Sequence, residues 1–242
     1  MTILSFYIQH NDCFVALGLK GKTIEKYFTL GQMETQAMVL VPFIQETWKK
    51  AGKPEVTCLM APRGPGSFTS LRVGLAAAQG LELAFPKAKI FSPTHFDVLA
   101  YAAGQKTLKS FIVLIDSKKG DFYGQLFNQS SSQKPKIYTN ETLEILLKDN
   151  PDMQVITDFY FLDRHAELKV TEEIRHLEER MLRGNLGILP LIEDRLIIND
   201  KNLATCQIEL YEKDMKLRKN PEYQKFQPFY LYLPEYVKQK PV

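Results

Sequence analysis

Glycine, proline and a hydroxyl residue follow one another at Gly64-Pro65-Gly66-Ser67, after an apolar run of strand length and before a helix-forming stretch. Glycine can adopt backbone angles that are closed to other residues, and Ser67 or Thr69 could cap the helix. Gly64, Gly66 and Ser67 could hold a phosphate, because free amides and the helix dipole point at an anion there. They could equally form a tight turn before a core helix. No Gly-Lys-Ser/Thr follows, so the P-loop pattern is not met.

The sequence contains no pattern typical of a metal site or of a catalytic nucleophile. The histidines are His10, His95, His165 and His176. None forms His-Glu-x-x-His, the pattern in which two imidazoles share one helix face. Ser67 lacks the Gly-x-Ser-x-Gly frame of a hydrolase nucleophile. The three cysteines are far apart, which favours reduced core residues over a disulfide frame. We therefore expect no metal and no catalytic residue.

Residues 68–85 predict a helix that is apolar nearly all round and should be buried on more than one side. Gly74 and Gly80 each cost about 1 kcal/mol relative to alanine inside a helix. Close packing against a second helix would offset that cost. The small side of the helix comprises Gly74, Ala77, Ala78 and Leu81. This helix is either a core element of the chain or a surface that a partner covers.

The elements around the turn follow a recognisable order. A three-strand meander precedes alternating helices and strands, which is the plan of one ribonuclease-H-like lobe, as in actin, hexokinase and Hsp70. The predicted strands are 2–8, 13–19, 23–30, 56–61 and 88–91, and the predicted helices are 33–50, 68–85 and 95–103. Pro42 should kink the first helix, and Ala51-Gly52 should end it.

The second half restarts this order more weakly. The predicted strands are 111–116, 121–127, 135–138 and 154–157, and the predicted helices are 139–148, 171–183 and 200–217. The fold class is therefore α/β, with two ribonuclease-H-like (actin-like ATPase) lobes, the second reduced. We expect an N-terminal lobe at 1–105 and a smaller C-terminal lobe at 106–242, whose last segment could pack back on the first.

Composition is that of an ordinary globular protein: 242 residues, 45% hydrophobic and 24% charged. The net charge of +3 permits a nucleic-acid partner but does not argue for one. The basic clusters 213–219 and 238–240 are interpreted as solvated surface rather than an RNA-binding patch. No run approaches the ~20 apolar residues of a membrane span, and Met1 is not followed by a signal-peptide pattern. We expect a cytoplasmic protein without a membrane partner.

The stretch Gly64–Ala76 closely resembles the signature of the TsaB (YeaZ) family, which is related to the M22 glycoprotease-like proteins. Leu40–Ile44 is similar to the family's first helix, proline included. Further similarity lies at 115–123, like the second-lobe hairpin, and at 228–233, like the closing Pro-x-Tyr-Leu-Arg. Departures from the family pattern are Ser70 for Gly, Tyr232 for Arg, and Ile8-Gln9-His10 in place of an Asp-Thr pair.

The resemblance implies a non-catalytic subunit in the synthesis of threonylcarbamoyladenosine on tRNA. Its partners would be the catalytic paralogue TsaD and the ATPase TsaE, with tRNA contacted only indirectly. A homodimer could compete, because family members self-associate. No cofactor is firmly implied, although ATP or ADP could sit at the interface with the partner. The paralogue's metal-binding helix carries two histidines, whereas 34–38 here has none.

The resemblance also implies where pairing would occur. The two helices 33–50 and 68–85 would form a helical bundle with the matching pair of the partner. The expected interface residues are Leu40, Ile44, Leu71, Gly74, Ala77, Ala78 and Leu81. On this view Gly74→Leu or Ala78→Phe should leave the monomer folded and weaken pairing.

Two alternatives remain open at this point. One is a small actin-like phosphotransferase that binds ATP through Gly64–Ser67 and the turn after Asp116. Against it, Ile8-Gln9-His10 stands where an active enzyme carries an aspartate, and Asp12 is interpreted as a turn residue. Asp116 reads equally well as an acid that closes a hairpin. The other alternative is a diverged TsaB-like protein with a different partner.

Overall fold

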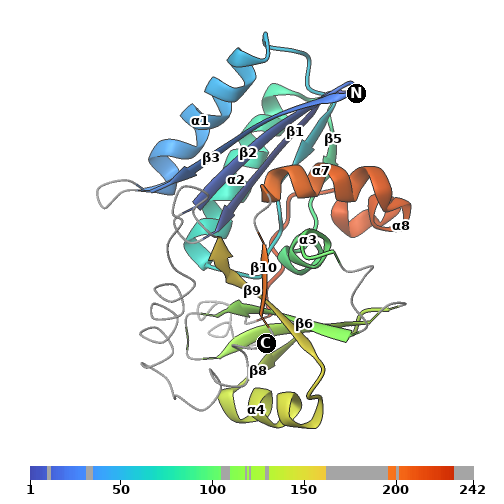
Figure 1. The fold of residues 1–242 in the computed structure, drawn as a ribbon. Coiled ribbons are helices and arrows are strands. Elements are labelled where there is room, and N and C mark those ends of the chain that lie inside the picture. The colour runs from blue at the N-terminus through green and yellow to red at the C-terminus, as the bar shows by residue number, and fades with distance from the viewer. Residues whose placement is uncertain are drawn as a thin grey trace, which may run out of the picture.

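Two five-stranded mixed sheets lie one above the other (Figure 1). The computed structural model describes residues 1–9, 12–30, 35–104, 110–117, 119, 121–128, 131–161, 196–199 and 202–231. The predicted helix at 171–183, together with His10, His165, His176 and Tyr232, lies outside these residues.

The two sheets share one strand order. The first runs β3-β2-β1-β4-β5, and the second, read from its far edge, runs β8-β7-β6-β9-β10. In both, the first three strands of the chain order are antiparallel neighbours and the last two are added in parallel. The strands are β1 (Ile3–Gln9), β2 (Asp12–Leu19), β3 (Lys22–Thr29), β4 (Cys58–Met60), β5 (Lys89–Phe91), β6 (Ser110–Asp116), β7 (Phe122–Asn128), β8 (Lys136–Tyr138), β9 (Gln154–Phe161) and β10 (Leu196–Asn199). This repeat confirms the predicted pair of ribonuclease-H-like lobes, and it adds β10, which the sequence patterns did not predict.

The helices match most of the predicted ranges. They are α1 (Gln36–Lys50), α2 (Phe68–Ala84), α3 (His95–Ala102), α4 (Asn140–Asp149), α7 (Leu203–Lys213) and α8 (Met215–Lys219), with a 3-10 turn, η1, at Pro221–Tyr223. The prediction of one helix over 200–217 was wrong. Asp214 ends α7, and its carboxylate accepts the Lys216 and Leu217 amides at 2.9 and 3.0 Å, which starts α8 in a new direction.

Side chains at the helix ends explain where several helices begin and end. Ser67 caps α2, as the sequence predicted, by accepting the Ser70 amide. Thr94 and Asp97 form a reciprocal capping box at the start of α3. Gly52, with φ of +80°, follows the last turn of α1, while α1 itself continues through Pro42 as one helix. Among the described helices, none is both long and apolar enough to cross a membrane.

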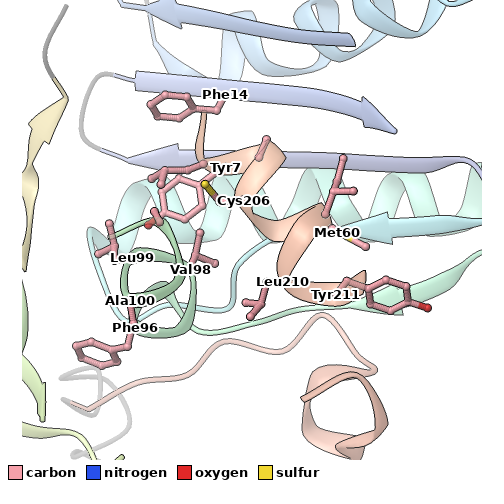
Figure 2. Packing of buried hydrophobic residues seen from close by; sticks show 14 of the residues in the cluster. Tyr7, Phe14, Met60, Phe96, Val98, Leu99, Ala100, Cys206, Leu210 and Tyr211 are labelled. Carbon is pink, nitrogen blue, oxygen red and sulfur yellow. The ribbon is translucent and has the colours of Figure 1, made fainter. Parts of the chain in front are cut away.

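Alternate side chains of β1 enter two different cores, because successive residues of a strand point to opposite faces. Leu4, Phe6 and Ile8 pack under α1 and α2. On the other face, Tyr7 lies in a core that α3 and α7 close, where Figure 2 shows it near Leu99 and Cys206. The first sheet therefore has a helical layer on each face.

Helix α7 follows the second sheet in the sequence, yet it packs on β1 and β2 of the first. Its fully buried Gln207 donates hydrogen bonds from Nε2 to the Phe6 carbonyl oxygen at 2.9 Å and to Ser5 Oγ at 3.2 Å. Because an amide buried among apolar groups must find polar partners, these bonds fix the position of α7 on the sheet.

Candidate functional site

The glycine-rich turn is a crossing point of three chain segments. Gly64 is buried and has φ of +99°, a region that side chains rarely adopt. A Cβ there would lie 3.0 Å from the Phe229 carbonyl oxygen and 3.0 Å from Leu71 Cδ2. Gly66 approaches the His95 ring, since a Cβ on it would lie 2.9 Å from Nδ1. Both glycines are therefore required by close packing within the chain.

The segment 220–231 is bound to this turn along much of its length. The Phe229 amide donates to the Arg63 carbonyl oxygen at 2.7 Å, and the Arg63 guanidinium donates to the Glu222 carbonyl oxygen at 2.8 Å. The Ser92 amide donates to the Tyr223 carbonyl oxygen at 2.7 Å. The backbone around the predicted phosphate turn is thus engaged by the chain itself, which favours a packing role for Gly64, Gly66 and Ser67.

A carboxyl group joins this segment to α3. Asp97 Oδ2 accepts hydrogen bonds from the Thr94 amide at 2.9 Å and from the Tyr223 hydroxyl at 2.8 Å. Removal of water raises the pKa of Asp97, while the bonds from Thr94 and Tyr223 lower it. Burial and the nearby Asp97 raise the pKa of Tyr223. The tyrosine hydroxyl therefore remains a hydrogen-bond donor throughout the physiological pH range.

The outward side of α1 and α2 has a different character. Four large apolar side chains are exposed there: Met38 (64%), Val41 (41%), Phe68 (41%) and Leu83 (84%). On α2 the exposed positions Phe68, Arg72, Ala76 and Gly80 follow one another at spacings of four, so they share one face. The two helices contact each other, and we call their outward side, which carries these exposed apolar side chains, the α1–α2 surface.

The predicted interface residues lie on the inner side of this layer. Leu40, Ile44, Leu71 and Ala78 are almost completely buried in the core under α1 and α2. Gly74, Ala77 and Leu81 are half-buried, and a Cβ on Gly74 would lie 3.5 Å from Ile8 Cδ1 of the chain's own β1. The expected small side of α2 therefore faces its own sheet.

Gly80 is the residue on α2 that the chain's own packing does not explain. It is exposed, and a Cβ placed on it would have nothing within 4 Å. The sequence indicated that Gly80 costs free energy in a helix, but the predicted interface did not include Gly80. Nor did it include Met38, Val41, Phe68 or Leu83. The four-residue spacing from Phe68 to Gly80 is the sequence signal that could have found this face.

The remaining candidate residues have structural partners. Asp12 is the first residue of β2 rather than a turn residue, and its carboxylate accepts the Tyr27 hydroxyl at 2.8 Å. Asp116 is the last residue of β6, in register with Phe122 of β7. The turn that follows is closed by a hydrogen bond from the Ser117 hydroxyl to Asp121. Within the described ranges, no three His, Cys, Asp or Glu side chains converge in a way that could hold a metal ion.

The sequence of this chain is similar to a known protein family and to several known proteins. Residues 35–143 match the family model described as TsaD, tRNA N6-adenosine threonylcarbamoyltransferase. A protein of Escherichia coli (strain K12), "tRNA threonylcarbamoyladenosine biosynthesis protein TsaB", is 29% identical over 150 residues, which is 61% of this chain and 63% of that protein. A protein of the same description from Buchnera aphidicola subsp. Schizaphis graminum is 32% identical over 36% of this chain and 40% of its own length. The chain thus spans less than two thirds of the length of either relative.

Solved structures extend the likeness to almost the whole chain. The structure described as YeaZ from Pseudomonas aeruginosa has a TM-score of 0.66 and 17% identity, covering 95% of this chain and 99% of that one. A second structure from Pseudomonas aeruginosa, of a protein with similarity to peptidase YEAZ, also has a TM-score of 0.66 at 17% identity, and covers 96% of this chain. At this level of identity the likeness establishes the fold.

Proposed function

We propose that this chain, which belongs to the TsaB/YeaZ family within the actin-like ATPase fold, is a non-catalytic subunit of a complex that makes threonylcarbamoyladenosine on tRNA. Its task in that complex is to bind the catalytic, TsaD-type subunit. The observation that carries this proposal is the α1–α2 surface, where large apolar side chains and an unexplained helical glycine are exposed together.

Several large apolar side chains exposed on one face are typical of an interaction surface, because monomeric soluble proteins rarely leave such patches open to water. Leu83 is 84% exposed although it lies in the last turns of a helix whose other leucines are at least half-buried. Gly80, one turn before it, leaves room for the backbone of another helix to approach. The surface is therefore suited to a helix pair from a partner, the arrangement that the family resemblance implied.

The contacts of the residues that could have held a nucleotide support the subunit role. In the described part of the chain, Asp12 is occupied by Tyr27 and the turn at Gly64–Ser67 is packed by α3 and the segment 220–231. We therefore assign catalysis to the partner and propose that ATP or ADP, if required, binds where the two subunits meet. The TsaE-type ATPase would join this pair, a homodimer would use the same α1–α2 surface, and tRNA would be bound mainly by the partner in the cytoplasm.

The direct test is size-exclusion chromatography with light scattering of the full chain, alone and mixed with the TsaD-type protein of the same genome. A one-to-one complex at micromolar concentration is the expected result. If the chain forms no complex with this protein and instead binds ATP-Mg tightly, the proposal is overturned in favour of an actin-like phosphotransferase. A chain that does neither would leave a diverged relative with another partner.

A further inference from the structure

A cavity lies on the first lobe away from the α1–α2 surface, between β5, α7 and α8. Its volume is about 630 Å³, which falls in the range of sites that hold small molecules. In Figure 1, α7 and α8 lie on the other side of the first sheet from α1, and β5 is the edge strand of that sheet. The lining residues are Met1, Ala88, Lys89, Ile90, Tyr211, Arg218, Lys219 and Gln224.

The lining carries three cationic side chains and no carboxylate. Lys89 comes from β5, whereas Arg218 and Lys219 come from α8, far away in the sequence. Across the described residues, none of these three makes an ion pair, although Lys26, Lys50, Arg63, Lys148 and Lys213 all do. Cations gathered in a concave site without counter-charges create a positive potential that attracts anions.

Arg218 is held in place before any ligand arrives. Its guanidinium lies 5.2 Å from the centre of the Tyr211 ring, and its carbonyl oxygen accepts Gln224 Nε2 at 3.3 Å. Tyr211 is itself buried against Phe91, with 5.2 Å between ring centres, and Figure 2 shows its ring extending away from the core around Cys206. A pre-oriented guanidinium loses less entropy on binding and can contact two oxygens of one phosphate.

Apart from the N-terminal amino group of Met1, the rest of the lining is apolar or neutral. Ala88, Ile90 and the Tyr211 ring offer surface to the uncharged part of a ligand, and Gln224 offers both a donor and an acceptor. A bare inorganic ion would leave most of this cavity unfilled. The site therefore suits an anion that is attached to a flat or apolar group.

We propose that this cavity binds a phosphorylated ligand of nucleotide size, whose phosphate is held by Arg218, Lys219 and Lys89. The phosphate could belong to a free nucleotide or to an RNA end, and the two sources share this chemistry. The basic cluster at 213–219 is thereby not only solvated surface, because folding brings Lys89 to it. The proposal is independent of pairing, since the cavity and the α1–α2 surface lie on different faces.

The test is isothermal titration calorimetry of the full chain with ADP, with a 5′-phosphorylated RNA tetranucleotide and with adenosine. We expect at least one phosphorylated probe to bind, more weakly as ionic strength rises, and adenosine to bind far more weakly. Binding of ADP identifies a free nucleotide as a sufficient ligand, and binding of the RNA alone identifies an RNA end. Failure of both phosphorylated probes, or equal binding of adenosine, would overturn the proposal.

Variants locate the binding. Arg218→Gln should weaken binding about tenfold, as expected for loss of one hydrogen bond to a charged group. Because Arg218 also packs on Tyr211, the double variant Lys89→Gln/Lys219→Gln, at two exposed positions, provides a second test with a comparable loss. Lys216→Gln is the matched control, since Lys216 is exposed on α8 but does not line the cavity. Unchanged affinity in both cavity variants would place the ligand elsewhere and contradict the site.

Discussion

The two helical layers of the first sheet differ in how completely they cover themselves. The layer formed by α3 and α7 has no large exposed apolar side chain, and hydrogen bonds from Gln207 fix it to β1. The layer formed by α1 and α2 buries Leu40 and Leu71 on its inner side but exposes Met38, Val41, Phe68 and Leu83 on its outer side. This difference supports our proposal that a partner covers the layer formed by α1 and α2, whereas the layer formed by α3 and α7 covers its own apolar side chains.

The second lobe provides a reference for this difference. Its helix α4 packs Leu143 and Leu147 on the sheet and exposes Ile145 at 60%. The exposed side also carries an ion pair between Glu144 and Lys148, with 2.6 Å between Oε1 and Nζ. A single exposed apolar residue is normal on a protein surface. The same strand order thus carries an ordinary outer helix in one lobe and, in the other, the α1–α2 surface that we propose for pairing.

The largest expected effect separates the two sides of α2. Ala78→Phe should destabilise the monomer by about 1–3 kcal/mol or more, because Ala78 is fully buried and the core has no room for a ring. The sequence alone led to the expectation that this variant leaves the monomer folded, and the burial of Ala78 argues against that expectation. Ala76→Phe, at an exposed position two residues earlier, should leave the unfolding free energy within about 0.5 kcal/mol of wild type. Chemical denaturation of both variants checks the contrast, and equal losses would contradict the orientation of α2.

The glycine turn offers the next largest effect. Gly64→Ala should lower the unfolding free energy by about 1–3 kcal/mol, because φ is +99° and the new Cβ would press on the Phe229 carbonyl oxygen. Denaturation by urea measures the loss. If the turn instead is free to bind phosphate, as the sequence left open, the variant would lose phosphate affinity while its stability stayed near that of wild type.

The hydrogen bond between Tyr223 and Asp97 should give a smaller and pH-dependent loss. Tyr223→Phe removes a donor to the carboxylate and should destabilise the chain by about 1–2 kcal/mol near neutral pH. Burial raises the pKa of Asp97 in the folded chain above its value in the unfolded chain. The contribution of Asp97 to the unfolding free energy is therefore fully present below the unfolded pKa, and it is lost as pH rises through the folded pKa. Loss of the Tyr223 hydroxyl raises that pKa further. The loss measured by denaturation should therefore shrink below about pH 4, where Asp97 is protonated in both states, and a loss independent of pH would contradict this account.

The smallest effect has the opposite sign. Gly80→Ala should stabilise the isolated chain by up to about 1 kcal/mol, because an alanine gains helix propensity and meets nothing within 4 Å. In the complex the same methyl group should obstruct the approach of the partner helix and weaken pairing. Thermal unfolding of the chain and titration with the partner check the two halves. A stabilised variant with unchanged affinity would show that Gly80 is not at the interface.

Much of the fold could be predicted from the sequence because strand and helix periods are local signals. Ser67, Thr94 and Gly52 mark helix ends by their own chemistry, and the structure confirms all three. Orientation was harder to predict. The helix 68–85 is apolar nearly all round, so its period did not show which side faces the sheet, and Ala78 was placed outward although it points inward. The position of the neighbouring strands decides this, and it is not a local property.

Long-range features were beyond the sequence for a related reason. The segment 220–231 contacts Arg63 and Asp97, and Lys89 meets Arg218 at the cavity, although no local pattern connects these positions. Helix α7 (Leu203–Lys213) packs on β1 (Ile3–Gln9) and β2 (Asp12–Leu19), which are far away in the sequence. Such contacts depend on how the two lobes are arranged, which only the whole fold determines.

The measurement that tests the central claim most directly compares Leu83→Asp with Ile145→Asp in binding to the TsaD-type protein of the same genome. Both residues are large, apolar and exposed, one on α2 and the other on α4. We predict that Leu83→Asp weakens the complex at least about tenfold, because a carboxylate would be desolvated at the interface, and that Ile145→Asp binds as wild type does. If the wild-type chain forms the complex and both variants bind with the same affinity, the α1–α2 surface is not the site of pairing.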